Sequence, residues 1–382
     1  MNPWAIPSRK NTLYLNPWAE RCVPDELLQI PLRNAQAGLT SPWLGPRDEH
    51  IKNKLVEGTM SDELLQDLPR TLPAFVRRFG TDAKCRAFLV RALWPEGFRC
   101  SGCGHREAWS HKKRLIEECR SCGKQHSILA GTMFEQTKTG LSKWFLAIYL
   151  VTSSKGGISA MELQRQMGFG SYQTAWSWLH KIRRAMIRPD REPLQQRVEV
   201  DETLVGGARP GKSGRGADGK TVVVGAVEAG TGANPGKGGR KRPLGRLRLA
   251  ALPDASAASL EGFITADTAK PLTVNTDGWA GYRGLTAKGY SHEAINLSQS
   301  WGDASLRLPA IHLVFSLAKR WLLGTHHGAV RPKHLQHYLD EFVFRFNRRK
   351  AKAISHGFAR LIQHAIKTPP TTYRGIVHEA AA

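Results

Sequence analysis

The sequence predicts an α/β protein in which a domain of alternating strands and helices follows a mainly helical N-terminal half. The first observation is a change of period, because apolar residues recur at helical spacing before Pro193 and at strand-like spacing after it. The second is the order of the later elements: three strands, a helix, a strand, a short strand and two terminal helices. The third is length, since 382 residues correspond to two or three domains of about 100–200 residues.

Residues 1–59 show no persistent helix or strand pattern, are rich in proline and carry tryptophans without any period. We expect them to be a poorly ordered extension, and they are a candidate for an over-extended reading frame. A helix is expected to begin at Ser61 or Asp62, because either side chain can cap the apolar pattern that follows. Residues 60–95 are therefore predicted to be an N-terminal helical segment.

Two Cys-x-x-Cys pairs stand 15 residues apart and contain Cys100, Cys103, Cys119 and Cys122. Each pair can hold two thiolates on a tight turn, and two such turns complete a tetrahedral sulfur shell around Zn²⁺. Two disulfides are the alternative, but the chain shows no secretory signal, and a cytoplasmic compartment keeps thiols reduced. Residues 96–127 are thus predicted to be a zinc ribbon whose Zn²⁺ is structural, while Cys22 and Cys85 are ordinary thiols.

Residues 138–190 have a helix-turn-helix layout. A strongly apolar helix over 143–151 is followed by two helices that Ser159 and Ser171 can cap, with Gly168 in the turn between them. Basic side chains gather near the end of the second helix, where we expect them to contact DNA: Lys181, Arg183 and Arg184. A helical hairpin that never touches DNA has the same pattern and remains the alternative.

The strands after Pro193 are expected at 196–201, 221–228, 245–252, 271–277 and 291–295. Helices are expected at 255–265 between the third and fourth strands, and at 309–323 and 333–348 after the fifth. This is the element order of an RNase H-like α/β domain. Residues 196–350 are therefore predicted to form such a domain, followed by a C-terminal tail over 351–382.

Two aspartates, Asp201 and Asp277, each end a predicted strand. Carboxylates from adjacent strands can bridge two Mg²⁺ or Mn²⁺ ions about 3.5–4 Å apart, an arrangement that drives in-line displacement at a phosphodiester. An aspartate at a strand end is more often a turn former or a helix cap. The order of the strands and the basic charge of the chain favour the catalytic interpretation.

A third metal ligand is expected on the helix after the fifth strand, where His312 is the first candidate. Lys319 lies seven residues further on, two helical turns away and on nearly the same face, so it is placed to contact a phosphate beside the metal. Imidazole is less suited to Mg²⁺ than a carboxylate is. Three carboxylates therefore remain competing candidates: Glu293, Asp303 and Glu341.

The chain carries 56 Lys and Arg against 32 Asp and Glu, which gives a formal net charge of +24. Residues 138–191, 204–248 and 319–350 account for +21 of it, whereas residues 1–60 contribute only +1. Such concentration favours a nucleic-acid partner over an evenly solvated basic surface. The expected phosphate contacts in the second and third stretches are Arg240, Lys241, Arg242, Lys319, Arg320, Arg345, Arg348 and Arg349.

Three passages carry a resemblance to a known family: Val198-Glu-Val-Asp-Glu-Thr-Leu-Val-Gly-Gly207, Thr276-Asp-Gly-Trp-Ala-Gly-Tyr282 with Gly289-Tyr-Ser-His292, and Lys319–Gly328 continuing to His334–Arg349. Over roughly residues 60–350 the chain resembles the bacterial insertion-sequence transposases that carry an N-terminal zinc ribbon ahead of a DDE-type, RNase H-like catalytic domain. The resemblance implies that Asp201 and Asp277 are the first two catalytic metal ligands. It aligns His312 with a variable third position, giving a DDH triad, and Lys319 with the basic residue seven positions later.

The resulting hypothesis is a DNA transposase, a polynucleotidyl transferase that uses two Mg²⁺ or Mn²⁺ ions and a structural Zn²⁺. It would bind terminal inverted repeats through the ribbon and the helix-turn-helix, cleave 3′ ends and join them to target DNA. We expect a homo-oligomer on DNA, no membrane partner, and a cytoplasmic, nucleoid-associated location in a bacterium. Two alternatives stay open: an inactive transposase-derived DNA-binding regulator and a stand-alone metal-dependent nuclease.

Overall fold

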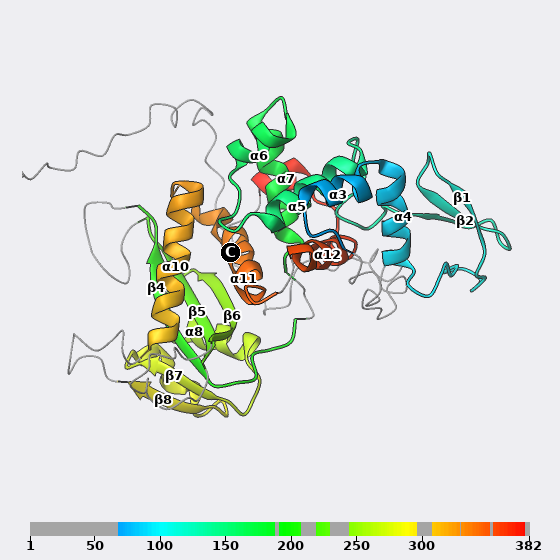
Figure 1. Cartoon of the computed structure of the whole chain (residues 1–382). Helices are drawn as coiled ribbons and strands as arrows, with labels where there is room; N and C mark the ends of the chain where they lie inside the picture. The colour runs from blue at the N-terminus through cyan, green and yellow to red at the C-terminus, as the bar shows by residue number, and fades with distance from the viewer. Residues whose placement is uncertain are drawn as a thin grey trace, which may run out of the picture. The chain divides into compact units, whose positions relative to one another are not determined.

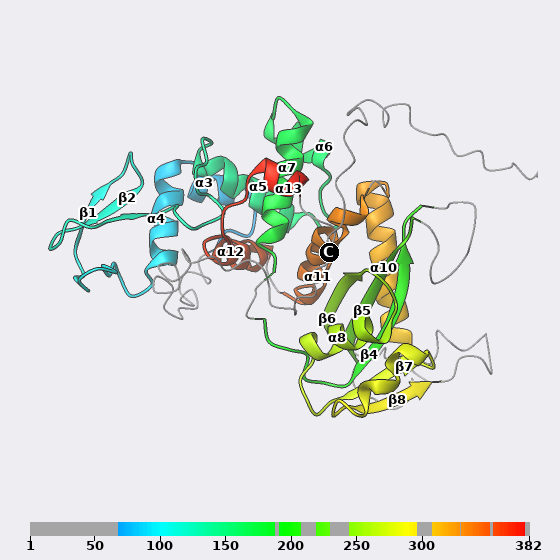
Figure 2. The ribbon, with the colours of Figure 1, turned by 180° about the vertical axis from the view of Figure 1, so that it is seen from behind.

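A computed structural model describes residues 68–187, 191–207, 219–229, 244–295, 308–328, 330–351 and 354–378. The expected N-terminal extension lies outside the described residues, and so do the candidate ligand Asp303 and the basic residues Arg240, Lys241 and Arg242. Figures 1 and 2 show the helices and strands from opposite sides. Within the described ranges, no helix has both the length and the apolar character needed to cross a membrane.

The described chain begins with helices that polar side chains cap. Thr71 and Thr81 each accept a hydrogen bond from a backbone N–H in the first turn of α3 (Leu72–Phe79) and α4 (Asp82–Leu93), respectively. The apolar run after the ribbon forms α5 (Leu141–Ser153), most of whose side chains are buried. The apolar helix that the sequence predicts is thus present, whereas the predicted helix start at Ser61 or Asp62 lies outside the described residues.

An aromatic core joins these helices to the C-terminal part of the chain. The ring of Phe79 lies 5.2 Å from Phe88, 5.3 Å from Phe145 and 5.4 Å from Phe358, measured between centroids, which is the range of favourable aromatic pairs. Phe358 is fully buried and lies on α12 (Ile354–Ala365), which packs against α5. Much of the segment expected to be a tail therefore belongs to a core, and α13 (Tyr373–Val377) follows it.

Along the chain, α4 is followed by a three-stranded antiparallel sheet that precedes α5, and we call it the ribbon sheet. It consists of β1 (Ala108–His111), β2 (Ile116–Cys119) and β3 (Gln125–Ser127), in that order. Arg86 on α4 donates hydrogen bonds to Ser110 of β1 and to Glu117 of β2. One face of the ribbon sheet is thereby attached to α4, beside which β1 and β2 lie in Figure 1.

The predicted pair of capped helices is formed by α6 (Ala160–Met167) and α7 (Tyr172–Arg184). The hydroxyls of Ser159 and Ser171 accept hydrogen bonds from the N–H groups of Glu162 and Thr174. Gly168 ends α6 with φ of 64°, a left-handed conformation that favours glycine. Most of α7 is buried, and it packs against α11 (Leu335–Asn347).

The second half of the chain forms a mixed five-stranded sheet, which confirms the predicted α/β class. The strand order is β6-β5-β4-β7-β8, built from β4 (Val198–Val205), β5 (Thr221–Ala229), β6 (Leu244–Leu252), β7 (Thr273–Asp277) and β8 (Ser291–Ile295). In this sheet β5 pairs antiparallel with both β4 and β6, whereas β7 pairs parallel with both β4 and β8. The element order is also the predicted one.

Helices cover both faces of this sheet. On one face, α8 (Ala257–Asp267) and the 3₁₀ helix η1 (Ala280–Leu285) bury Val200, Val224 and Ala226. On the other face, α10 (Pro309–His326) and α11 pack on Val223 and Leu249, with η2 (Pro332–His334) between the two helices. Val200 projects toward α8. Because successive strand residues point to opposite faces, Asp201 projects toward α10.

A buried group of three charges ties α7 to α11 and α5. Glu341 accepts hydrogen bonds from Arg183 at 2.8 Å and from Arg345 at 2.7 Å, and the side chains of Glu341 and Arg183 are 0% and 1% exposed. Arg345 also donates to the carbonyls of Val151 and Ser154 at the end of α5. This corrects the expectation that Arg183 and Arg345 contact DNA, because their guanidinium groups are engaged inside the protein.

We expect Glu341→Gln to lower the free energy of unfolding by about 3–5 kcal/mol, since it leaves two guanidinium groups without their buried counter-charge. Urea denaturation followed by fluorescence measures the change. Glu162→Gln is the matched control, because Glu162 pairs with Arg165 on the exposed surface of α6 and such pairs contribute about 0–1 kcal/mol. Equal effects of the two substitutions would contradict the prediction.

The same group predicts a loss of stability in acid. Burial alone would raise the pKa of Glu341 above its ordinary 4.5, but Arg345 and Arg183 outweigh burial and hold it at about 2. Because the folded pKa lies below the unfolded one, the stabilisation is complete above pH 4.5 and disappears as the pH falls toward 2. Denaturation midpoints measured across this range should fall more steeply for the wild type than for Glu341→Gln.

Candidate metal centres

A buried carboxylate on β4, that of Glu199, connects the sheet to the start of α10 at the candidate catalytic site. Its Oε2 accepts hydrogen bonds from the backbone N–H groups of Ala310 at 2.7 Å and Ile311 at 3.1 Å. These donors lie in the first turn of α10, where N–H groups have no acceptor within the helix. The residue before the helix, Leu308, has no side chain that could cap them. Glu199 therefore supplies the cap from the sheet, and its charge also complements the helix dipole.

Close packing at Gly225 brings α10 down onto the sheet beside Asp201. Gly225 of β5 stands opposite Asp201 in the strand register. A Cβ atom at position 225 would lie 2.8 Å from Ile311 Cδ1 and 2.9 Å from the ring of Phe315, closer than packed atoms normally approach. The absence of a side chain there thus lets α10 lie directly over the strands that carry the aspartate.

Three carboxylates meet at this edge of the sheet: Asp201, Glu202 and Asp277 each offer an oxygen atom, and these atoms lie within 4.8 Å of one another. Asp277 is the last residue of β7, which runs parallel to β4. Asp201 Oδ1 accepts a hydrogen bond from the N–H of Glu202 at 2.8 Å, and Asp277 Oδ1 accepts one from the N–H of Trp279 at 3.0 Å. Carboxylate oxygens so arranged fit the ligand preference of Mg²⁺ and Mn²⁺.

His312 approaches the same cluster from the first turn of α10. Its Nε2 lies 3.8 Å from Asp201 Oδ2 and is buried without a hydrogen-bond partner. Desolvation lowers the pKa of His312, although Asp277 acts in the opposite direction. The neutral ring therefore directs a nitrogen toward the carboxylates, and a metal ion bound there would satisfy that nitrogen.

Glu202 is a site residue that reasoning from the sequence missed. Its Oε2 accepts a hydrogen bond of 2.5 Å from the hydroxyl of Tyr282, which is fully buried in η1. Burial, followed by the nearby carboxylates, raises the pKa of the Tyr282 hydroxyl well above its ordinary value. Tyr282 thus stays a proton donor that holds Glu202 toward the cluster, and the motif that contains Asp277 supplies it.

Lys319 lies on the exposed side of α10, two turns after His312. Desolvation and the neighbouring Lys220 lower its pKa, while Asp201 raises it. Its charge therefore interacts with the carboxylate cluster from the solvent side. The competing ligands lie elsewhere: Glu293 pairs with Arg197 at 2.5 Å on the surface, and Glu341 is enclosed by its two arginines.

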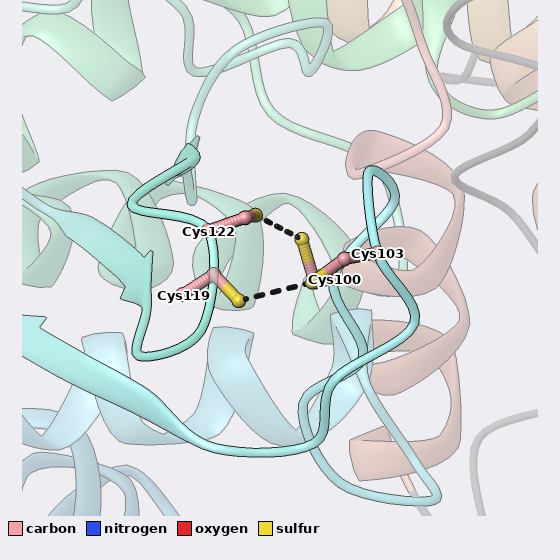
Figure 3. Close-up of side chains that lie close together, drawn as sticks. All are labelled: Cys100, Cys103, Cys119 and Cys122. Atoms are coloured by element: carbon pink, nitrogen blue, oxygen red, sulfur yellow. Dashed lines mark hydrogen bonds between the residues drawn. The ribbon is translucent and has the colours of Figure 1, made fainter.

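The four ribbon cysteines come together at the other centre, as Figure 3 shows. Sγ of Cys100 lies 3.6 Å from that of Cys122, and Sγ of Cys103 lies 3.5 Å from that of Cys119. All four are free thiols, so the alternative of two disulfides is not formed. A tetrahedron of Zn–S bonds of about 2.3 Å has S–S edges of about 3.8 Å, so the cluster fits Zn²⁺ after small adjustments.

Backbone and side-chain donors surround this sulfur cluster. The N–H of Gly102 lies 3.3 Å from Cys100 Sγ, and Nε2 of the buried His126 lies 3.4 Å from the same atom. Gly104 and Gly123 follow the two knuckles with φ of 77° and 69°, which favours glycine. Donors of this kind stabilise thiolates and orient them toward a metal.

Most of the described basic residues that were expected to contact DNA are partly buried or donate hydrogen bonds within the protein. Lys181 and Arg184 are half-buried near the end of α7, and desolvation lowers the pKa of Lys181. Arg348 and Arg349 donate to the carbonyls of Phe344 and Phe346 and lie over the same rings. Of the expected residues that the structure describes, Lys319, Arg320 and Arg349 are exposed, and the first turn of α7 also faces solvent at Tyr172, Gln173 and Thr174.

Comparison with known proteins gives two family matches. Residues 193–347 match the ISXO2-like transposase domain, and residues 80–125 match the transposase zinc-ribbon domain. A protein of Halobacterium salinarum described as an uncharacterized protein in transposable element ISH50 is 24% identical over 290 residues, covering 71% of this chain and 92% of that protein. The first match contains the carboxylate cluster and His312, and the second contains the four cysteines.

We expect Cys103→Ser to lower the zinc content from about one ion per chain to a small fraction of that, because it removes one of four thiolates from a closed shell. Zinc released by denaturation and measured with a chromogenic chelator reports the content. Cys85→Ala is the matched control, since Cys85 is buried in α4 and burial raises its pKa to about 12. Unchanged zinc in Cys103→Ser would refute a four-thiolate site.

Removing the cap of α10 should loosen the start of that helix. Glu199→Ala leaves two buried N–H groups without an acceptor, which costs about 1–3 kcal/mol, and amide exchange at Ala310 and Ile311 should accelerate. Glu199→Gln keeps an acceptor but loses the charge, so its effect should be intermediate. Hydrogen-exchange mass spectrometry over the start of α10 checks the order of the three proteins, and equal protection in all of them would contradict the assignment.

Proposed function

Because the chain belongs to the insertion-sequence transposases, we propose that it binds the terminal inverted repeats of its element, cleaves their 3′ ends and joins them to target DNA. The observation that carries this proposal is the meeting of Asp201, Asp277 and His312 at one edge of the sheet, inside the region that matches the ISXO2-like transposase domain. We further propose that the sheet and its helices form an RNase H-like domain. The mixed strand order, with three antiparallel strands followed by two parallel ones, supports this.

We assign metal binding to Asp201, Asp277 and His312, with Glu202 as a further carboxylate. Two Mg²⁺ or Mn²⁺ ions held by these residues would activate the attacking oxygen and stabilise the leaving oxygen of a phosphodiester. Three carboxylates with a neutral imidazole leave a net positive charge beside two divalent ions, which complements the negative charge of a phosphate. Glu202 thus provides the third carboxylate that His312 does not.

The surrounding residues orient these ligands. Glu199 fixes the first turn of α10, so that the imidazole of His312 faces the two aspartates. The Tyr282 hydroxyl donates to Glu202 and prevents its carboxylate from turning into solvent. Lys319 lies on the solvent side of α10 with its charge close enough to interact with Asp201, and we assign it to the phosphate next to the scissile bond.

DNA binding is assigned to the zinc ribbon and to α6 and α7. In helix-turn-helix proteins the N-terminal residues of the second helix contact base edges, and Tyr172, Gln173 and Thr174 are the exposed residues at that end of α7. We therefore assign DNA contact to the first turn of α7 instead of to the basic residues near its end. The net charge of +24 should make affinity fall steeply with salt through counterion release, and a homo-oligomer is expected on paired element ends.

The decisive test is cleavage of a duplex that carries the element end. Asp201→Asn and Asp277→Asn should slow 3′-end cleavage in Mg²⁺ by about three orders of magnitude or more, since each removes a metal-binding charge, and should leave end binding intact. Asp254→Asn is the matched control, because Asp254 is an exposed aspartate that accepts hydrogen bonds at the start of α8. Cleavage by either active-site variant at the wild-type rate would refute the assignment.

The same assay separates the alternatives. Binding of the ends without cleavage by the wild type would identify a DNA-binding regulator, and cleavage without joining to a target duplex would identify a nuclease. His312→Ala and Glu202→Gln should weaken Mn²⁺ binding, which titration calorimetry measures without any turnover. Mn²⁺ affinity that is unchanged in His312→Ala would move the third ligand to another residue.

A further inference from the structure

The ribbon sheet has two faces, and within the described residues α4 contacts one of them through Arg86. Register pairs Trp109 of β1 with Glu118 of β2 and Glu118 with Gln125 of β3, so these side chains share a face. The opposite face carries Glu117, which is attached to Arg86 of α4. We call the face with Trp109, His111, Glu118 and Gln125 the outer face; among the described residues, these four belong neither to the cysteine cluster nor to the partners of Arg86.

Hydrogen bonds hold the polar side chains of the outer face in fixed positions. Oε2 of Glu118 accepts a hydrogen bond from Gln125 Nε2 at 2.9 Å and lies 3.1 Å from His111 Nε2. Both contacts use the same oxygen of Glu118. The side chain of Glu118 is 29% exposed, so a partner approaching the outer face meets an acceptor that is already oriented.

Trp109 and Arg120 form a stacked pair beside this network. The indole of Trp109 is 57% exposed, and the guanidinium carbon of Arg120 lies 4.3 Å from the ring centre. Arg120 Nη1 also donates to Glu107 Oε2 at 3.1 Å. Arg120 belongs to the knuckle between Cys119 and Cys122, so the sulfur cluster fixes its backbone. The planar guanidinium of Arg120 thus lies over the indole ring, and its other N–H groups can donate hydrogen bonds to a partner.

We propose that the outer face of the ribbon sheet reads base edges in the major groove of the element ends, a step that rests on the proposed transposase function. Charge favours DNA, because residues 99–125 carry seven Lys and Arg against three Glu, and one of these glutamates is paired with Arg86. The major groove admits strands, and arginine donors match guanine while a carboxylate accepts from the cytosine amine. Arg120 and Glu118 therefore fit a G·C pair.

The turn between β1 and β2 has a different role in this arrangement. Lys112, Lys113 and Arg114 are exposed there, and flexible ammonium groups contact phosphates without regard to sequence. The ribbon thus separates a positioning element, the turn, from a reading element, the outer face. This separation makes the proposal testable, because the two kinds of contact respond differently to salt and to DNA sequence.

The experiment measures binding of the full-length protein by fluorescence anisotropy, without Mg²⁺ or Mn²⁺. One duplex carries the element end, and the other is a scrambled duplex of equal length and composition. Trp109→Ala, Arg120→Ala and Arg120→Lys should each reduce the preference for the end about tenfold or more, with scrambled-DNA affinity changed less than about threefold. Lys113→Ala, the matched control, should weaken both duplexes alike and lower the salt slope by about one.

Zinc content of about one ion per chain in each variant shows that the ribbon has folded, and Arg120→Lys keeps the charge if Arg120→Ala does not fold. A wild-type preference that persists in the folded Trp109 and Arg120 variants overturns the proposal while leaving the transposase function intact. Loss of self-association with an unchanged DNA preference also overturns it and makes the outer face a protein interface. If the wild type shows no preference here and also no cleavage in the Mg²⁺ assay described above, the proposed function itself is refuted.

Discussion

The bond between Glu199 and the first turn of α10 is the constraint on which the candidate catalytic site depends. A carboxylate fixed in a strand satisfies two N–H groups at a helix start that has no cap of its own. Since Asp201 lies two residues further along β4 and His312 lies next to Ile311, one contact sets their relative position. Gly225 completes the constraint, because it removes the side chain that would hold α10 away from the sheet.

The sequence allowed much of this site to be predicted, since its main residues follow from periodicity. Asp201 and Asp277 lie at the edge where parallel strands meet, and His312 and Lys319 share a helix face, so each position was accessible to a pattern argument. Glu202 was not, because adjacent strand residues point to opposite faces. Only its long side chain and the Tyr282 hydroxyl bring it to the cluster, and that contact spans 80 residues of sequence.

The sequence did not predict which arginines are buried in the protein. A basic residue near a helix end has the same local pattern whether it faces solvent, a phosphate or a buried carboxylate. Arg183 meets Glu341 from 158 residues away, and no local rule predicts that pairing. Arg345, in turn, fills carbonyl acceptors at the end of α5. Net charge therefore favoured a nucleic-acid partner, whereas which arginines are engaged inside the protein depends on the packing of α7 on α11.

The same long-range contacts connect the two halves of the described chain. α10 begins at the carboxylate cluster, and near its other end Thr325 donates a hydrogen bond to the carbonyl of Gly156. Gly157, with φ of 82°, has Trp321 of α10 close to the place where a Cβ would lie. The short connection between α5 and α6 thus contacts α10, and Arg345 joins α11 to the end of α5. Packed, hydrogen-bonded contacts therefore link the segment that leads into α6 to the helix that carries His312.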